Sequence, residues 1–190
     1  MKRFAWLIPA LAVFFTLSHP LSALSDDFLI MPGDILQVTV WKEEGMDREV
    51  IVLPDGSITF PLAGTITVQN ITTAEAEGLI KEKLAKSIPD AAVTVAVKAP
   101  LGHKVNVLGQ VQKPGEVLMP SEMSVMQALS QAGGLTAFAS ENSITIIRKG
   151  PEGKESIPFA YDSVASGRHP ENDILLKPGD VIVVPTSGLF

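Results

Sequence analysis

The sequence predicts an α+β fold in two small domains, and three observations support this. Short segments rich in Val and Ile alternate with Pro-Gly and Asp-Gly turns, as strands joined by tight connections do. Two other segments place apolar residues at helical spacing behind a capping-box pair. A stretch with Pro and Gly at residues 99–102 separates two such sets, and a chain of 190 residues has room for two small domains.

The first 25 residues have the layout of a secretory signal peptide. Lys2 and Arg3 precede an apolar run over residues 4–17, and small residues stand at Ser25 and two positions before it. This pattern predicts cleavage between Ser25 and Asp26. The alternative is a transmembrane anchor, which needs about 20 apolar residues and so fits this shorter run less well. Loss of both basic residues would change the net charge from −6 to −8.

Residues 26–100 are predicted to form the first domain. Pro32-Gly33-Asp34 is a turn, because Pro presets φ at the second turn position and Gly tolerates positive φ at the third. Pro54-Asp55-Gly56 is a hairpin turn, which predicts that the strands on its two sides pair with each other. Strands are predicted at residues 35–41, 50–53, 58–60 and 93–97, with a polar connection at residues 43–48.

A helix is predicted between the third and fourth of these strands. Thr72 and Glu75 have the spacing of a capping box, and apolar residues follow at helical spacing. Pro89 ends the pattern, because proline cannot continue a helix. The first domain therefore reads as strands, one helix and a returning strand.

Residues 101–190 are predicted to form the second domain. Ser124 and Gln127 make a second capping box for a short helix, which Gly133-Gly134 ends. Tyr161 and Asp162 open a short helix or a connection, and neither is assigned a catalytic role. Strands are predicted at residues 105–111, 117–119, 143–148, 157–159 and 181–185. Turns are predicted at residues 113–116, 150–153 and 177–180.

Two turns repeat the same three residues. Pro32-Gly33-Asp34 and Pro178-Gly179-Asp180 both precede an apolar strand, which could reflect an internal duplication or coincidence. Asp34, Asp55 and Asp180 are conceivable catalytic carboxylates. Each lies inside a turn motif, however, where Asp commonly bonds its own backbone, so we predict structural roles.

The remaining composition argues against several classes of function. With 15 basic and 21 acidic residues the chain is acidic, which disfavours nucleic acid as a partner. Cys is absent, so the sequence offers no thiolate nucleophile, thiolate metal site or lipid-modified Cys. His103 and His169 are far apart and have no ligand spacing around them. We therefore predict no enzymatic activity, no catalytic residues, no cofactor and no metal.

Five segments, in order, resemble the polysaccharide biosynthesis/export family. Three lie in its export domain and its closing segment, and two are similar to a soluble-ligand-binding β-grasp (SLBB-like) domain. They are residues 29–38, 52–64, 107–115, 128–135 and 176–185. The family-motif residues, which we predict to be structural, are Pro32, Gly33, Asp34, Pro54, Asp55, Gly56, Gly109, Pro114, Gly115, Gly133, Gly134, Pro178, Gly179 and Asp180.

The resemblance implies an N-terminal polysaccharide-export domain, a C-terminal β-grasp domain and a role in the periplasm at the outer membrane of a Gram-negative bacterium. Family members form homo-oligomeric rings that pass capsule or exopolysaccharide from an inner-membrane co-polymerase to the outside. The larger members continue into a C-terminal membrane helix that this sequence lacks. We therefore expect a separate outer-membrane β-barrel to complete the route.

An alternative from a different class stays open at this stage. A β-grasp domain hosts many functions, so the chain could be a periplasmic module that binds a glycan or small ligand, or a scaffold, without conducting polymer. Self-association distinguishes the ring-forming exporter from the binding module, because a ring must oligomerise and a simple binder need not.

Overall fold

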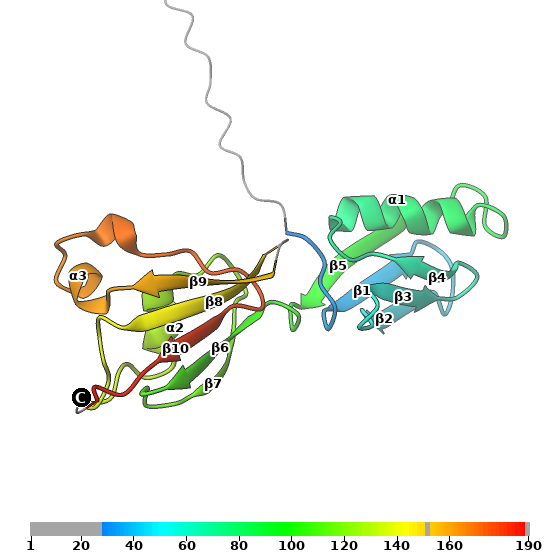
Figure 1. The fold of residues 1–190 in the computed structure, drawn as a ribbon. Coiled ribbons are helices and arrows are strands. Elements are labelled where there is room, and N and C mark those ends of the chain that lie inside the picture. The colour runs from blue at the N-terminus through cyan, green and yellow to red at the C-terminus, as the bar shows by residue number, and fades with distance from the viewer. Residues whose placement is uncertain (1–27, 151–152, 189–190) are drawn as a thin grey trace, which may run out of the picture.

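The computed structural model describes residues 28–150 and 153–188, which form two lobes joined by a short connection (Figure 1). The N-terminal lobe comprises residues 28–99 and the C-terminal lobe residues 104–188. Each lobe has its own β-sheet, its own helix and its own cluster of buried hydrophobic residues, so the α+β prediction is confirmed. The predicted cleavage point between Ser25 and Asp26 lies outside the described residues.

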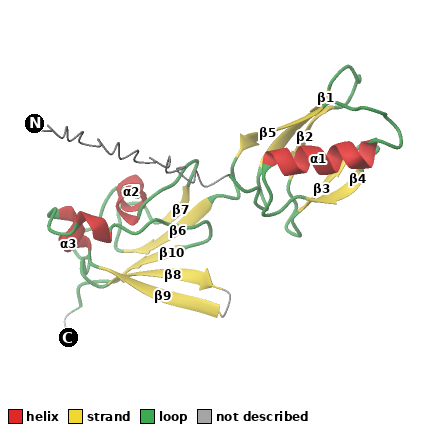
Figure 2. Ribbon diagram, turned by 90° about the horizontal axis from the view of Figure 1, so that it is seen from above, coloured by secondary structure: helices red, strands yellow, loops and turns green. Residues whose placement is uncertain are grey.

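The N-terminal lobe contains a three-stranded antiparallel sheet in the order β2-β1-β5 and a separate two-stranded hairpin of β3 and β4. Helix α1 packs against β5 and β4 and covers one face of the sheet (Figure 2). The elements are β1 (Ile35–Val40), β2 (Asp47–Ile51), β3 (Ser57–Phe60), β4 (Gly64–Thr67), α1 (Thr73–Leu84) and β5 (Val93–Ala99).

The predicted pairing across the Pro54-Asp55-Gly56 turn is wrong. The turn itself forms, with the Leu53 N–H donating to the Ser57 carbonyl at 2.8 Å. Beyond it the strands separate: β2 pairs with β1, whereas β3 pairs with β4, a strand that the sequence analysis missed. Strand β2 also begins earlier than expected, at Asp47, inside the predicted polar connection. These polar residues sit in a strand because β1 supplies their backbone hydrogen bonds and one of their faces stays open to water.

Helix α1 begins as its capping box predicts. The Glu75 N–H donates to the Thr72 Oγ1 at 3.2 Å, and the Thr72 N–H donates to the Glu75 Oε2 at 2.8 Å. The bond from the Thr72 N–H and a second one from the Thr72 hydroxyl, which donates to the same Oε2 at 3.0 Å, lower the pKa of Glu75 below its ordinary value. Ala76, Ile80 and Leu84 lie on the buried side of the helix.

Replacing Thr72 by Ala is expected to destabilise the N-terminal lobe by about 1 kcal/mol, because the orphan N–H of Glu75 loses its acceptor. Urea unfolding followed by far-ultraviolet circular dichroism measures the change. Ser121→Ala, at an exposed loop position, serves as the control. An equal effect of the two substitutions would contradict a role for the cap.

The C-terminal lobe contains a five-stranded sheet in the order β7-β6-β10-β8-β9. Strand β10, the last in the sequence, inserts between β6 and β8 and runs parallel to β6 and antiparallel to β8. The elements are β6 (Lys104–Gly109), β7 (Gly115–Leu118), α2 (Val125–Gln131), β8 (Ile144–Gly150), β9 (Gly153–Phe159), α3 (Tyr161–Ala165), a 3-10 turn η1 (Pro170–Asn172) and β10 (Val181–Val184).

The core of this lobe lies on one face of its sheet. Val105, Ile144 and Ile182 point to that face and are fully buried, together with Val125 and Leu129 of α2. The second capping box forms as predicted, between Ser124 and Gln127. No helix among the described residues is long and apolar enough to cross a membrane.

Candidate functional site

The two Pro-Gly-Asp turns have the same local structure. In the first, the Asp34 N–H donates to the Met31 carbonyl at 3.1 Å, and the Met31 N–H donates back to the Asp34 Oδ2 at 2.8 Å. Gly33 has a φ of +97°, which a residue with a Cβ rarely adopts. The carboxylate of Asp34 is thereby buried while it ties its own turn.

The second turn repeats each of these contacts. The Asp180 N–H donates to the Lys177 carbonyl at 3.0 Å, and the Lys177 N–H donates to the Asp180 Oδ2 at 2.8 Å. Gly179 has a φ of +90°. In both turns the glycine N–H also donates to a carbonyl of a neighbouring segment, Val52 or Lys104, at 2.8 Å. The repeated Pro-Gly-Asp residues therefore form the same hydrogen-bonded turn twice, once before β1 and once before β10.

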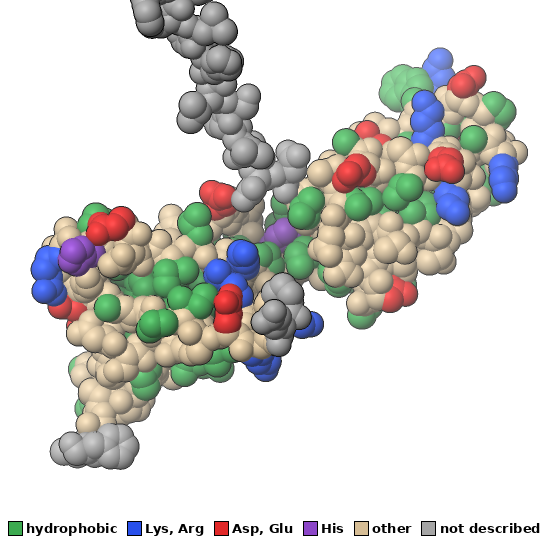
Figure 3. Space-filling model, turned by 45° about the horizontal axis from the view of Figure 1, so that its top comes forward, with side chains coloured by type: hydrophobic (Ala, Val, Ile, Leu, Met, Phe, Trp, Pro, Cys, Tyr) green, Lys and Arg blue, Asp and Glu red, His purple; other side chains and the backbone are tan. Residues whose placement is uncertain are grey.

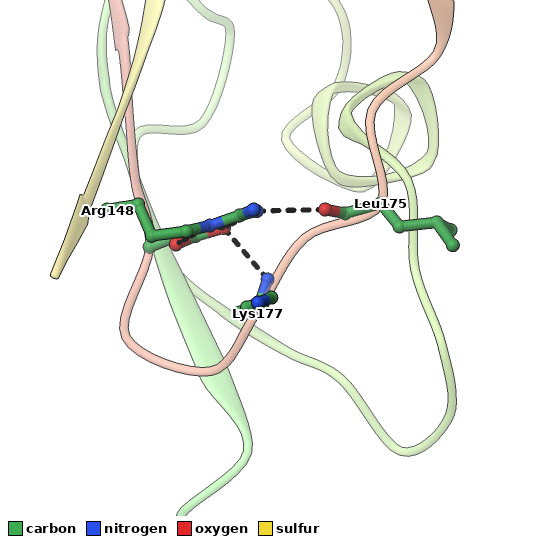
Figure 4. A network of polar contacts seen from close by, with 4 residues as sticks. Arg148, Leu175 and Lys177 are labelled. Carbon is green, nitrogen blue, oxygen red and sulfur yellow. Dashed lines mark hydrogen bonds and ion pairs between the residues drawn. The ribbon is translucent and has the colours of Figure 1, made fainter. Parts of the chain in front are cut away.

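The two buried carboxylates differ in their third partner. Asp180 accepts hydrogen bonds from Arg148 of β8, at 2.6 Å from Nη2 and 3.0 Å from Nε. The same guanidinium donates to the Leu175 carbonyl at 2.9 Å (Figure 4). The hydrogen bonds with Asp180 raise the pKa of Arg148 above its ordinary value. Arg148 of β8 thus holds the turn that precedes β10 in place through its bonds with Asp180.

Asp34 instead contacts the connection between the two lobes. Its Oδ1 accepts a hydrogen bond from the Gly102 N–H at 2.8 Å, and its Oδ2 lies 3.4 Å from the His103 Nε2. The same His103 nitrogen lies 3.1 Å from the Leu29 carbonyl, and its ring stacks on Phe28 with centroids 4.3 Å apart. The first turn therefore orders the connection that leads into β6 as well as the start of β1.

Asp55 bonds its own turn, as predicted for this residue type. Its Oδ1 accepts from the Ser57 hydroxyl at 2.7 Å and from the Ser57 N–H at 3.0 Å. These bonds lower the pKa of Asp55 below its ordinary value. Pro54 is exposed beside it, and Gly56 has a φ of +78°.

The glycines of the C-terminal lobe occupy turns and one close strand contact. Gly133 and Gly134 end α2, with φ of +82° and +83°. Pro114 lies in the exposed connection before β7, and Gly115, also exposed, is the first residue of that strand. Gly109 has a φ of +91°, and a Cβ added there would lie 2.0 Å from the Val184 carbonyl oxygen. These positions have conformational reasons to be Gly or Pro, and their structural role stays our prediction.

Two hollows mark the described surface. One, of about 430 Å³, lies beside the end of α2 and is lined by Met126, Leu129, Ser130, Gly133, Gly134 and Tyr161. The other, of about 380 Å³, lies between Phe28, β5 and Pro120. The first has Tyr161 as its titratable lining residue and the second has none, so neither wall presents an acid–base pair.

The histidines occupy separate surroundings. His103 lies at the lobe junction, whereas the His169 Nδ1 lies 3.0 Å from the Glu171 Oε1 on the exposed surface. Within the described residues, no group of three His, Cys, Asp or Glu side chains could hold a metal ion. The two histidines therefore take part in contacts at the lobe junction and on the surface, and they lie apart from each other.

The sequence analysis missed the partners of both buried carboxylates. One signal was available for the Arg148 contact: Arg148 continues the inward-facing series of Ile144 and Ile146, where a charge requires a partner. No comparable signal pointed from Asp34 to Gly102, because these residues are 68 positions apart.

Two family models match successive parts of the chain. Residues 22–98 match the family model of polysaccharide biosynthesis/export protein, and residues 104–160 match the SLBB domain. The EPS I polysaccharide export outer membrane protein EpsA of Ralstonia nicotianae is 30% identical over 190 residues, covering 87% of this chain and 49% of that protein.

A second relative is more distant. The polysialic acid transport protein KpsD of Escherichia coli is 25% identical over 160 residues, covering 83% of this chain and 28% of KpsD. The chain thus spans about half the length of EpsA and little more than a quarter of KpsD.

Proposed function

Because the chain belongs to the polysaccharide biosynthesis/export family, we propose that it is a periplasmic, ring-forming component of a capsule or exopolysaccharide export route. It receives polymer from an inner-membrane co-polymerase and passes it toward an outer-membrane exit, which a separate β-barrel provides. The order of an export domain and an SLBB domain in one chain carries this proposal. The names of the relatives, one an outer membrane export protein and one a transport protein, support it.

The proposal includes no catalytic step. The polymer would move through the assembly without a bond being made or broken, so the chain needs binding surfaces rather than a nucleophile or a general base. The turn carboxylates are consistent with this, since Asp34 and Asp180 are buried and engaged in structural hydrogen bonds.

We also propose that the two domains divide near residue 100, with residues 26–100 and 101–190 as their extents. Strand β5 ends at Ala99 and β6 begins at Lys104. The two clusters of buried residues share no member. Each lobe therefore contains the interior that an independently folding unit needs.

Self-association is supported by the open face of the C-terminal sheet. Alternation and register place Leu108, Val181, Val183, Ile147 and Leu118 on the face opposite the core. We call these five residues the apolar sheet face; Leu108 and Leu118 are about half exposed. Hydrophobic side chains gather over the strands of this lobe (Figure 3). An uncovered apolar surface of this kind is typical of protein contacts, and we propose a second copy of the chain as its partner.

Deletion of the gene in its host is expected to remove the polymer from the cell surface and medium while polymer or precursor is retained inside. The measurement is polysaccharide content in separate surface, medium and periplasmic fractions. Complementation with the wild-type gene restores export. Leu108→Lys, which puts a charge into the apolar sheet face, should restore neither export nor the assembly seen by sedimentation of the purified protein.

Ala74→Lys, at an exposed position of α1, is the matched control and should behave as wild type. Unchanged surface polymer after deletion would contradict the export role and favour the alternative of a glycan- or ligand-binding or scaffolding module.

A further inference from the structure

The N-terminal sheet has one face that no described element covers. Alternation along β1 places Leu36, Val38 and Val40 in the core and Gln37 and Thr39 on the opposite side. The register with β2 and β5 adds residues of both neighbouring strands to that side. The same side also carries the apolar residues Ile35, Ile51 and Ala96. We define the polar sheet face as its polar residues Gln37, Thr39, Asp47, Glu49, Thr94 and Lys98.

Trp41 stands at one end of this face. Its N–H donates to the Ala92 carbonyl at 2.9 Å, which continues the β1–β5 register by one pair beyond Val40 and Val93. By strand alternation its indole lies on the same side as Thr39. The side chain is 69% exposed, although burial of an indole is favourable. An aromatic ring exposed beside a polar surface is available to a ligand.

The polar side chains of the face are held in place across the three strands. The Asp47 Oδ1 accepts hydrogen bonds from the Gln37 Nε2 and, at 2.9 Å, from the Thr39 Oγ1. Lys98 of β5 forms an ion pair with Glu49 of β2. Side chains already ordered in this way lose little conformational entropy when a ligand binds. The face offers both donors and acceptors, and its ammonium group partly offsets its two carboxylates.

The open face of the other lobe is mixed: beside the apolar sheet face it carries Lys104, Asn106, Glu116 and Thr145, with an ion pair between Lys104 and Glu116. The apolar sheet face consists of Leu, Ile and Val, which suits a protein partner. The polar sheet face pairs an indole with amide, hydroxyl and carboxylate groups. This combination matches a sugar, whose ring has an apolar C–H face and whose edge carries hydroxyls that both donate and accept. Because Asp47 and Glu49 outnumber Lys98 and leave the face with a net negative charge, the match favours neutral rather than strongly acidic sugars.

We propose that the polar sheet face and Trp41 form a contact surface for neutral sugar units of the exported polymer. The C–H face of a sugar ring lies on the indole, and hydroxyls exchange hydrogen bonds with Gln37, Thr39 and Asp47. This inference rests on the proposed export function and gives it a site. The surface is an uncovered sheet face, so each contact is weak and a polymer can move across it.

A ligand-observed NMR titration of the purified protein with a neutral β-linked glucose hexasaccharide tests the proposal. We expect saturable binding with a dissociation constant on the order of millimolar. Trp41→Ala should weaken binding about tenfold or more, and Trp41→Phe should retain part of it. Phe138→Ala is the matched control, because Phe138 of the other lobe is also 69% exposed, and binding should stay within about twofold of wild type.

Equal effects of Trp41→Ala and Phe138→Ala, or no binding by the wild-type protein, would overturn the proposed surface. So would a Trp41→Ala protein that binds normally but sediments as smaller assemblies, since Trp41 would then contact protein. In the deletion strain, Trp41→Ala should restore less export than Phe138→Ala. If deletion blocks export and Trp41→Ala restores it fully, the sugar contact fails while the export function stands. If deletion leaves export unchanged, the export function itself fails.

Discussion

Replacing Gly109 by Ala is expected to destabilise the C-terminal lobe by about 3 kcal/mol or more. Two costs combine at this position. The φ of +91° disfavours any residue with a Cβ, and the new methyl group would lie 2.0 Å from the Val184 carbonyl oxygen. That oxygen cannot move freely, because it accepts a hydrogen bond from the Gln110 N–H at 2.9 Å and belongs to the backbone of β10. The substitution must therefore push β6 and β10 apart.

Gly134→Ala separates the two costs. Gly134 has a similar φ of +83°, but a Cβ added there meets nothing within 4 Å. We expect this control to lose about 1–2 kcal/mol, from backbone strain alone. Urea unfolding followed through the amide NMR signals of β6 and β10 reports the C-terminal lobe, whereas the near-ultraviolet signal of Tyr161 overlaps that of Trp41 in the other lobe. Equal losses for both variants would show that β10 does not pass as close to Gly109 as the structure has it.

Replacing Asp180 by Ala is expected to cost about 3–5 kcal/mol, the range for removing one member of a buried ion pair. The Asp180 side chain is 1% exposed and that of Arg148 14%. Without the carboxylate, the guanidinium is left mostly buried with the Leu175 carbonyl as its remaining partner. The Lys177 N–H also loses the acceptor that closes the turn before β10. Since β10 lies between β6 and β8, a loosened turn weakens the centre of the sheet.

Two further variants give this prediction its controls. Asp180→Asn keeps an oxygen for the Lys177 N–H and removes the charge, so its loss should be smaller than that of Asp180→Ala. Asp162→Ala breaks an exposed ion pair with Arg168 and should change stability by less than about 1 kcal/mol. The same amide NMR signals of β6 and β10 measure all three. An effect of Asp180→Ala no larger than that of Asp162→Ala would contradict the structural role of the buried pair.

The turns and helix starts were predictable because their signals act over a few residues. Thr72 and Glu75, or Ser124 and Gln127, satisfy each other's backbone partners three positions apart, whatever the rest of the chain does. The Pro-Gly-Asp turns are equally local, since the aspartate bonds the N–H three residues before it. The family resemblance rested on these same local motifs, and the matched domains confirm it.

Strand partners and distant contacts were decided by the tertiary structure. A strand offers the same backbone donors and acceptors to any neighbour, so the Pro54-Asp55-Gly56 turn could not show that β2 pairs with β1 and β3 with β4. Likewise, nothing near Asp34 pointed to Gly102, and nothing near Val181 placed β10 between β6 and β8. The sequence by itself determined the local elements, because hydrogen bonds within a few residues specify them. Only packing over the whole chain determined which elements meet, and with it the two open sheet faces on which the proposed function depends.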